Sequence, residues 1–376
     1  MDRRTFLSLS GAATAGAFVD VAFARTIAQQ PVLESMLETT KVPGIAVAGI
    51  VDGKPFQKAG GAREAGGKNR ITVDTVFAAA SLSKPVFAWA VRDLVKDGKL
   101  ALDKPLGDYL DLGLTGDARR ITAAHVLTHS TGLPNWRFQP NVALATDFAP
   151  GARWQYSGEG IVLLQRTVEK ISGQPIAAFM KERVLQPMGM ASSTFAWTPD
   201  LQSRAATGHD RNGAAIERAL AFYERRNFET LDKAGLRGES ATYDQIAAAY
   251  EKAGTPMLAV GMSPNMAGSL QTTAADFGKF LQRVLADTAA RPDDFKPRID
   301  VNRHIAWTLG LGVDRSLGAQ AYFQWGDGPG FKNFAWVQPA RKTALVFLTN
   351  GDRGAALYAW VLRQLLREDP AALYWI

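Results

Sequence analysis

A serine and a lysine three residues apart stand at the start of a helical pattern in this sequence. Ser81 and Lys84 lie in the run Ala-Ala-Ser-Leu-Ser-Lys-Pro, after which apolar residues recur every three or four positions. Residues three apart share one face of a helix, so their side chains can form a hydrogen bond. A serine hydroxyl is a weak nucleophile until a neighbouring base or cation activates it. The pair therefore indicates nucleophilic catalysis; the alternative is that Ser81 or Ser83 is an ordinary helix N-cap.

Other nucleophile and metal motifs are absent from the sequence. There is no cysteine, which excludes disulfides, thiolate metal sites and a cysteine nucleophile. No Gly-x-Ser-x-Gly pentapeptide occurs, so the nucleophile elbow of an α/β-hydrolase is not indicated. His125 and His129 have the spacing of a zinc pair, but no acidic residue lies between them and turn residues follow. We interpret them as histidines that stabilise a turn, and we expect neither a metal nor an organic cofactor.

Six sequence blocks, in this order and spacing, resemble the serine β-lactamase and penicillin-binding-protein-like hydrolases. The most similar branch holds class C β-lactamases, family VIII carboxylesterases and D-aminopeptidases. The resemblance covers residues 31–350. The blocks are Ala-Ala-Ser-Leu-Ser-Lys-Pro at 79–85, Leu-Thr-His-Ser-Thr-Gly-Leu-Pro at 127–134, Trp-Gln-Tyr-Ser-Gly-Glu-Gly-Ile-Val-Leu-Leu at 154–164, Pro-Met-Gly-Met at 187–190, Ala-Gly-Ser-Leu-Gln-Thr-Thr-Ala-Ala-Asp at 267–276 and Trp-Gly-Asp-Gly-Pro-Gly-Phe at 325–331.

This resemblance implies a role for each matching residue. Ser81 would be acylated, Lys84 would prepare it for deprotonation, and Tyr156, the first residue of the family's Tyr-x-Asn block, would be the partner acid or base. The pKa of a free tyrosine is about 10, so we expect the Lys84 cation to lower that of Tyr156. The oxyanion would be bound by the backbone N–H of Ser81 and by another N–H in the region 326–328.

Two positions depart from the family's pattern. The family's Tyr-x-Asn is here Tyr-Ser-Gly, so Gly158 lacks the amide that commonly holds the acylamino carbonyl of a substrate. On the edge strand, the family's Lys/His-Thr/Ser-Gly is replaced by Gln-Trp-Gly at 324–326, or by Trp-Gly-Asp at 325–327 if the register shifts by one. A tryptophan at this strand resembles the family VIII esterases, whose block reads Trp-Gly-Gly.

Both departures favour ester or other neutral substrates over penicillins. The cation that usually meets the carboxylate of a β-lactam or peptide is missing, and Asp327 makes the region less favourable for anions. A site without its specific hydrogen-bond partners loses discrimination. Lys332 or another nearby base is an alternative source of the cation. The residues expected in the substrate and oxyanion region are Gly158, Trp325, Gly326, Asp327 and Gly328.

Periodicity predicts the elements that position these residues. Strands are expected at 42–51, 55–60, 307–313, 321–325, 334–338 and 344–348, and terminal helices at 31–39 and 355–366. Joining the strands from both ends into one antiparallel sheet gives an α+β fold, β-lactamase/transpeptidase-like by resemblance. Residues 25–83 and 295–376 would form this α/β lobe, residues 84–294 an inserted, mostly helical lobe, and the active site would lie between them. The charged segment 217–254 is interpreted as a lid or as padding.

The N-terminal residues predict export. Residues 3–7, Arg-Arg-Thr-Phe-Leu, precede an apolar stretch at 9–19 and Ala-Phe-Ala at 22–24, which together read as a twin-arginine-type signal peptide over residues 1–24. The alternative is a basic N-terminal helix of the mature fold. No later apolar stretch approaches the ~18 residues of a membrane span, so we expect a periplasmic protein without stable membrane insertion.

Composition and charge indicate a globular protein that does not bind nucleic acid. The chain has 376 residues, 47% of them hydrophobic and 21% charged, which is ordinary for a globular protein. Its net charge of +7 is spread out without a run of five like charges, which argues against nucleic acid as a partner. The leading interpretation is an exported serine hydrolase that acts on a small-molecule ester, amide or peptide substrate. Alternatives are a β-lactamase or D-Ala-directed carboxypeptidase, and a catalytically silent cell-wall-binding protein on the same fold.

The export signal can be tested at its paired arginines. We expect the double variant Arg3→Lys, Arg4→Lys to accumulate as an uncleaved precursor in the cytoplasm, because the twin-arginine route requires both guanidinium groups. The measurement is cell fractionation followed by immunoblotting, with the unsubstituted protein as control. Normal delivery of the double variant to the periplasm would refute this interpretation.

Overall fold

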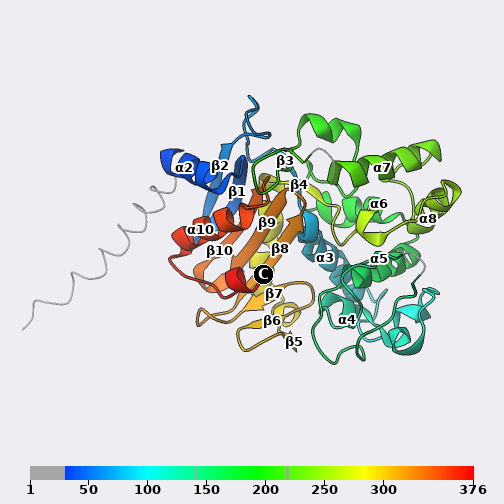
Figure 1. Cartoon of the computed structure of the whole chain (residues 1–376). Helices are drawn as coiled ribbons and strands as arrows, with labels where there is room; N and C mark the ends of the chain where they lie inside the picture. The colour runs from blue at the N-terminus through cyan, green and yellow to red at the C-terminus, as the bar shows by residue number, and fades with distance from the viewer. Residues whose placement is uncertain (1–29, 140–141, 217–219) are drawn as a thin grey trace, which may run out of the picture.

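One large sheet lies beside a group of helices in the computed structural model (Figure 1). The structure describes residues 30–139, 142–216 and 220–376. The residues interpreted as a signal peptide, 1–24, lie outside these ranges. Across the three described ranges, no helix has both the length and the apolar character needed to cross a membrane.

The sheet has eight antiparallel strands and joins the two ends of the chain. Two strands come from the N-terminal part and six from residues 299–349, in the order β2-β1-β10-β9-β8-β7-β6-β5. The predicted α+β fold, with strands from both ends of the chain joined in one antiparallel sheet, is thus confirmed. The strands are β1 (Gly44–Val51), β2 (Lys54–Gly61), β5 (Ile299–Asp300), β6 (Ile305–Trp307), β7 (Gly312–Asp314), β8 (Ala321–Gly328), β9 (Phe331–Gln338) and β10 (Thr343–Thr349).

The single strand expected at 307–313 is wrong, because the chain turns between β6 and β7. Gly310 has a φ of +113°, a conformation that side-chain-bearing residues rarely adopt. The Thr308 hydroxyl donates to the carbonyl oxygen of Leu311 and accepts from its N–H. Leu309 and Leu311 are buried in the core, so the apolar pattern continues through the turn and conceals it.

Helices cover both faces of the sheet. Leu345 and Phe347 of β10 pack in one core cluster with α2 and α10, whereas Val346 and Leu348 pack in the other, against α9. Successive strand residues point to opposite faces, so a strand covered on both faces is apolar throughout. The covering helices are α2 (Gln30–Thr40), α9 (Ala274–Ala290) and α10 (Gly354–Leu366).

The second lobe is helical and lies beside β8 in Figure 1. Its first helix, α3, follows the short strand β3 (Val76–Ala78), which pairs with β4 (Gln271–Thr273), and the 3₁₀ turn η1 (Ala80–Leu82). The segment predicted as a lid or padding contains α7 and α8, which share a small core of their own. The helices are α3 (Ser83–Lys96), α4 (Ala123–Leu127), α5 (Gly158–Ser172), α6 (Ile176–Met180), α7 (Leu220–Lys233) and α8 (Tyr243–Lys252).

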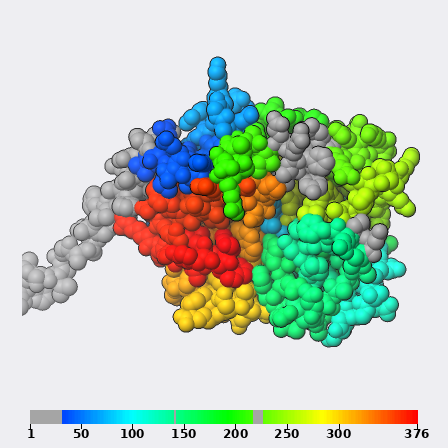
Figure 2. Space-filling model, in the orientation of Figure 1, coloured from blue at the N-terminus to red at the C-terminus, as the bar shows by residue number. Residues whose placement is uncertain are grey.

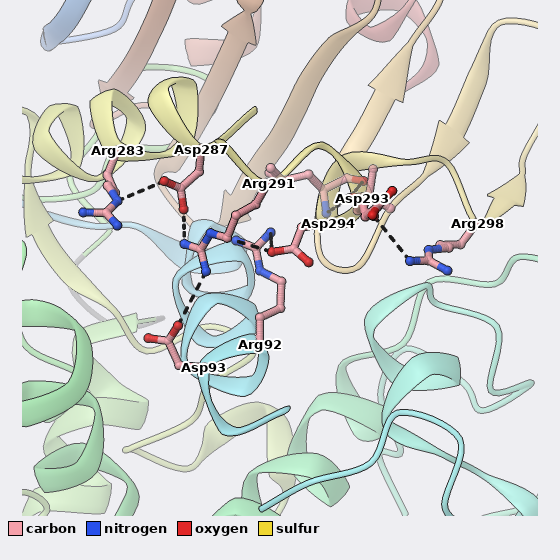
Figure 3. Close-up of polar contacts among 10 residues, drawn as sticks. Arg92, Asp93, Arg283, Asp287, Arg291, Asp293, Asp294 and Arg298 are labelled. Carbon is pink, nitrogen blue, oxygen red and sulfur yellow. Dashed lines mark hydrogen bonds and ion pairs between the residues drawn. The ribbon is translucent and has the colours of Figure 1, made fainter. Parts of the chain in front are cut away.

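An ion-pair network fixes α3 against the sheet lobe (Figure 3). Arg291, which follows α9, pairs with Asp93 of α3 at 3.8 Å and with Asp287. Arg92 of α3 pairs with Asp294 at 3.9 Å, and burial lowers the pKa of Arg92 to about 10. Buried charges are stable only when opposite charges accompany them, so these pairs hold α3 against α9 and the residues that follow it, which pack on the sheet. The helix that begins next to Ser81 is thereby held against the sheet.

Candidate active site

Ser81 and Lys84 form a hydrogen bond at the start of α3. The Nζ atom of Lys84 lies 2.8 Å from Ser81 Oγ and 2.7 Å from the carbonyl oxygen of Ala267. Ser81 is half-buried, whereas Lys84 is only 2% exposed. The predicted contact is therefore present, and the hydroxyl is open to a substrate while the amine is not.

The backbone around Ser81 is held in a strained conformation by its neighbours. Ala80 has a φ of +49°, which residues with a Cβ rarely adopt. The Ser83 hydroxyl donates to the carbonyl oxygen of Ala80 at 2.6 Å and accepts from the N–H of Leu270 at 3.0 Å. Asn333 of β9 donates to the carbonyl oxygen of Ala78 at 3.0 Å. Neither Ser81 nor Ser83 makes a side-chain cap of α3, so their hydroxyls do not serve the role of an ordinary N-cap.

Burial determines the protonation of Lys84. The loss of hydration disfavours the ammonium form and lowers the pKa of Lys84 to about 7. Near neutral pH a large fraction of Lys84 is thus a neutral amine with a free electron pair. Such an amine in contact with Ser81 Oγ can accept the hydroxyl proton.

Tyr156 contacts the same serine, but its pKa differs from the expectation. Burial raises the pKa of Tyr156 above 10, and hydrogen bonds with Ser81 and Gln324 only partly oppose this. The expected lowering of this pKa by a Lys84 cation is wrong, because the loss of hydration that Tyr156 undergoes on burial disfavours the phenolate and dominates its pKa. The Lys84 Nζ atom lies 4.8 Å from the centroid of the Tyr156 ring. Tyr156 is therefore a neutral phenol at physiological pH, able to donate a proton.

Two aromatic rings fix the orientation of Tyr156. Its ring centroid lies 4.2 Å from that of His129 and 5.0 Å from that of Trp325. The Nδ1 atom of His129 accepts the N–H of Ser157 at 3.2 Å, and burial lowers the pKa of His129 well below its usual value. His129 is thus a neutral residue that holds the turn at Tyr156. Trp154 and Trp307 complete the aromatic surroundings.

His125 likewise binds a backbone group near a helix start. Its Nδ1 atom accepts the N–H of Thr122, which caps α4. Within the described part of the chain, no group of three or more histidine and carboxylate side chains is arranged to hold a metal ion.

Strand β8 offers an open edge opposite Ser81. Its pairing with β7 ends at Phe323. The Gln324 side chain donates to the carbonyl oxygen of Trp325 at 2.8 Å, so the backbone of Trp325 faces the open edge. Backbone groups two residues apart on a strand point the same way, which also directs the N–H of Asp327 to this edge. This N–H is the candidate second oxyanion donor, within the predicted region.

A glycine allows β8 to approach the serine closely. A Cβ atom added to Gly326 would lie 2.2 Å from the carbonyl oxygen of Ala79. The corresponding atom on Gly328 would lie 3.5 Å from the Cβ of Ala80, an ordinary contact. In Figure 2, β8 (orange) is seen where the red C-terminal residues meet the green helical lobe. The strand and the turn that carries Ser81 therefore form the two sides of the site.

Gly158 lies where an indole ring leaves no room for a side chain. A Cβ atom on Gly158 would lie 2.4 Å from the Trp136 ring. The backbone N–H of Gly158 is bound by the carbonyl oxygen and the side-chain oxygen of Asn135. Trp136 thus presents an aromatic surface two residues beyond Tyr156, at the position of the missing amide.

Lys332 is near the site, but it is already paired. Its Nζ atom lies 2.5 Å from Asp327 and 3.2 Å from Asp352. The polar residue of β8 that reaches the tyrosine is instead Gln324, whose Nε2 atom lies 3.1 Å from the Tyr156 hydroxyl. This contact supports the Gln-Trp-Gly register over the shifted one.

Sequence reasoning missed several residues that position the site. No sequence pattern indicated Trp136, because this residue lies in a loop and contacts Gly158, the first residue of a helix more than twenty positions later. Asn333 and Ser83 act on backbone groups, which no side-chain motif reveals. The cross-strand register of β8 with β9 would have placed Asn333 opposite Gly326 if the hairpin at 328–331 had been recognised.

Comparison with known proteins identifies the family. Residues 25–367 match the family model described as Beta-lactamase. The esterase EstB of Burkholderia gladioli is 34% identical over 164 residues, which cover 35% of this chain and 41% of EstB. Penicillin-binding protein 4 of Amycolatopsis lactamdurans is 25% identical over 361 residues, 87% of this chain and 86% of that protein. The match to EstB therefore spans less than two thirds of that protein.

Solved structures share the fold. A class C β-lactamase superposes with a TM-score of 0.72 at 16% identity, over 93% of this chain and 97% of that chain. A penicillin-binding protein homologue from Pyrococcus abyssi gives a TM-score of 0.68 at 21% identity, over 91% and 78%. The chain belongs to the Beta-lactamase family and is a serine hydrolase, which confirms the resemblance seen in the sequence.

The close approach at Gly326 can be tested by adding one methyl group. We expect Gly326→Ala to push β8 away from the turn at Ala79, to destabilise the protein by about 1–3 kcal/mol and to lower kcat/KM at least about tenfold. Gly328→Ala is the matched control, because its added Cβ makes only an ordinary contact and its losses should be much smaller. Esterase assays and thermal melting measure both effects. Equal losses in the two variants would contradict this account.

The pKa of Lys84 predicts a pH profile. Below pH about 7 Lys84 becomes an ammonium that cannot accept the Ser81 proton, so kcat/KM should fall as the pH decreases through about 7. Lys84→Ala should lower kcat by about two orders of magnitude, and Lys84→Arg should abolish this limb of the profile. Steady-state assays across this range provide the measurement. A flat profile for about one pH unit on either side of neutrality would show that another group is the base.

Proposed function

We propose that the protein is an exported serine esterase that hydrolyses neutral esters through an acyl-enzyme on Ser81. The observation that carries this proposal is the contact of Ser81 Oγ with a Lys84 amine that is partly neutral near pH 7 and with the protonated Tyr156 phenol. A base and an acid on one hydroxyl are what acyl transfer requires. Small amides are the related substrates that the same chemistry permits.

The groups act in a defined order. Lys84 Nζ takes the Ser81 proton while Oγ bonds to the ester carbonyl carbon, and the backbone N–H groups of Ser81 and Asp327 stabilise the oxyanion. The carbon–oxygen bond to the alcohol then breaks. The Tyr156 hydroxyl gives its proton to the leaving alkoxide and takes one back from the Lys84 ammonium, so that Lys84 is again a neutral amine. A water molecule next gives one proton to Lys84 while its oxygen bonds to the acyl carbon. The bond to Ser81 Oγ then breaks, Oγ takes the proton back from Lys84, and the carboxylic acid leaves.

The substrate preference follows from what surrounds this machinery. Gln324, a neutral side chain, contacts Tyr156, and Trp136 fills the space beside Gly158. These groups offer apolar surface and hydrogen bonds but no charge for a substrate carboxylate. The similarity to EstB and to the lovastatin esterase of Penicillium rubens, 29% identical over 205 residues, supports ester hydrolysis.

A β-lactamase or D-Ala-directed carboxypeptidase is the alternative with the same chemistry. The relatives include a β-lactamase and the D-alanyl-D-alanine-carboxypeptidase/endopeptidase AmpH of Escherichia coli, the latter 26% identical over 197 residues. A silent cell-wall-binding protein is disfavoured, because Ser81, Lys84 and Tyr156 are all present and in contact. For the cellular location, the sequence of residues 1–24 supports export to the periplasm.

A pair of substrates distinguishes these functions. We expect turnover of 4-nitrophenyl butyrate and negligible turnover of a chromogenic cephalosporin. The neutral Gln324 contacts Tyr156, and Lys332 is already paired with Asp327 and Asp352, so neither supplies a free cation for the cephalosporin carboxylate. Ser81→Ala should abolish ester turnover, and Tyr156→Phe should lower kcat by about two orders of magnitude. Ser203→Ala, an exposed serine in η5 (Pro199–Ser203), is the matched control.

The outcomes separate the candidates. Cephalosporin turnover without ester turnover would favour the β-lactamase or carboxypeptidase. If neither substrate is turned over and no adduct forms on Ser81 with a fluorophosphonate, the protein is a binding protein.

A further inference from the structure

A lysine and two aspartates form an ion cluster beside the open edge of β8. Lys332 Nζ lies 2.5 Å from Asp327 Oδ1 and 3.2 Å from Asp352 Oδ1, and it donates to the carbonyl oxygen of Gly328 at 3.2 Å. Asp327 and Lys332 are direct partners in the register of β8 with β9, so their side chains lie on one face of the sheet. One positive and two negative charges leave the cluster with a net charge of −1.

This cluster lies next to the reacting groups. Gly326 and Gly328, the neighbours of Asp327, pack against Ala79 and Ala80, which lead directly to Ser81. Trp325, on the same face of β8 as Asp327, stacks on the Tyr156 ring, as described above. The Asp327 side chain lies on the face of β8 that carries Trp325, whereas its backbone N–H faces the open edge. A substrate whose carbonyl oxygen accepts this N–H therefore lies beside the carboxylate of the same residue.

The two ends of the ion pair differ in exposure. The Asp327 side chain is 62% exposed, whereas that of Lys332 is 20% exposed. Asp352, which holds the other side of Lys332, also accepts the N–H of Gly330 at 2.9 Å and is fixed in place. The negative group of the cluster thus faces the solvent side of the site, and the positive group is turned inward.

We propose that Asp327 and Lys332 set the charge preference of the active site. The Asp327 carboxylate repels a substrate that carries a negative charge near its scissile bond. Its pairing with Lys332 also withholds the cation that would otherwise attract such a substrate. The substrate class is then an ester that is neutral or cationic near the reacting carbonyl. This inference rests on the proposed hydrolysis at Ser81 and adds the charge of the substrate that the site prefers.

Two substitutions of opposite effect test the proposal. The readout is the ratio of kcat/KM for 4-nitrophenyl hemisuccinate to that for 4-nitrophenyl butyrate, two esters that differ by a terminal carboxylate. Asp327→Asn removes a negative charge and should raise the ratio about three- to fivefold, the size expected for nearby unit charges at a hydrated surface. Lys332→Gln leaves both aspartates unopposed and should lower the ratio. Both shifts should shrink as salt is added.

A matched variant controls for the loss of an ion pair. Asp293 of η7 (Pro292–Phe295) pairs with Lys296 at the same 2.5 Å distance and is exposed. Asp293→Asn therefore breaks an equivalent surface pair without altering β8, and its ratio should match that of the unsubstituted protein. Thermal melting of all variants verifies that they are folded.

A second probe separates this inference from the proposed function. Phenylboronic acid and 3-carboxyphenylboronic acid accept the Ser81 oxygen at boron without turnover, so their relative affinities report charge preference even if no ester is cleaved. Titration calorimetry should give the same order of ratios, Asp327→Asn above unsubstituted above Lys332→Gln. Equal ratios within twofold, or shifts in the same direction, would overturn the proposal. Binding of neither boronic acid and turnover of neither ester would overturn both the inference and the esterase function.

Discussion

The burial of the Lys84 amine is the constraint on which the site depends. A lysine in water is an ammonium and no base; only the loss of hydration brings its pKa to about 7. That loss would be costly without hydrogen-bond partners, and Ser81 and Ala267 supply them. The loop that carries Ala267 is itself fixed from outside: Gln165 of α5 binds the N–H of Met266, and Asn227 of α7 donates to the carbonyl oxygen of Ser263. The helical lobe therefore positions the loop that buries the Lys84 amine.

The second requirement is that strand β8 comes into contact with the turn that carries the serine. Gly326 makes this possible, because any side chain there would meet Ala79. The Asn333 side chain of β9 then donates a hydrogen bond to the carbonyl oxygen of Ala78, the last residue of β3 before the turn. At the far end of α3, the pair of Arg92 and Asp294 holds this helix against the segment that follows α9. The nucleophile and the second oxyanion donor thus come from segments far apart in the chain, the turn before α3 and strand β8, and their alignment depends on the packing between these segments.

The sequence predicted what depends on local pattern and spacing. The Ser81–Lys84 pair follows from helical periodicity, and the single sheet follows from apolar strands at both ends of the chain. Prediction from the sequence failed for the properties that depend on the packing of residues distant in the chain. The pKa of Tyr156 is raised because the burial of this side chain disfavours the phenolate more than its hydrogen bonds favour it, and sequence spacing does not reveal burial. The turn within 307–313 was concealed because Leu309 and Leu311 are buried, and the pairing of Lys332 required the register of two strands.

The site combines a shared chemical centre with altered recognition groups. Among the groups that move protons, Lys84 is fully buried, whereas Ser81 and Tyr156 are half-buried and open toward the substrate. The recognition groups lie on an open strand edge and a loop, where Gln324 and Trp136 can replace charged or amide groups without disturbing the core. The buried amine acts on any substrate whose carbonyl carbon reaches Ser81. The choice of substrate therefore depends on the recognition groups at the strand edge and in the loop. A change of substrate class then requires new side chains at the edge, and the catalytic centre can stay as it is.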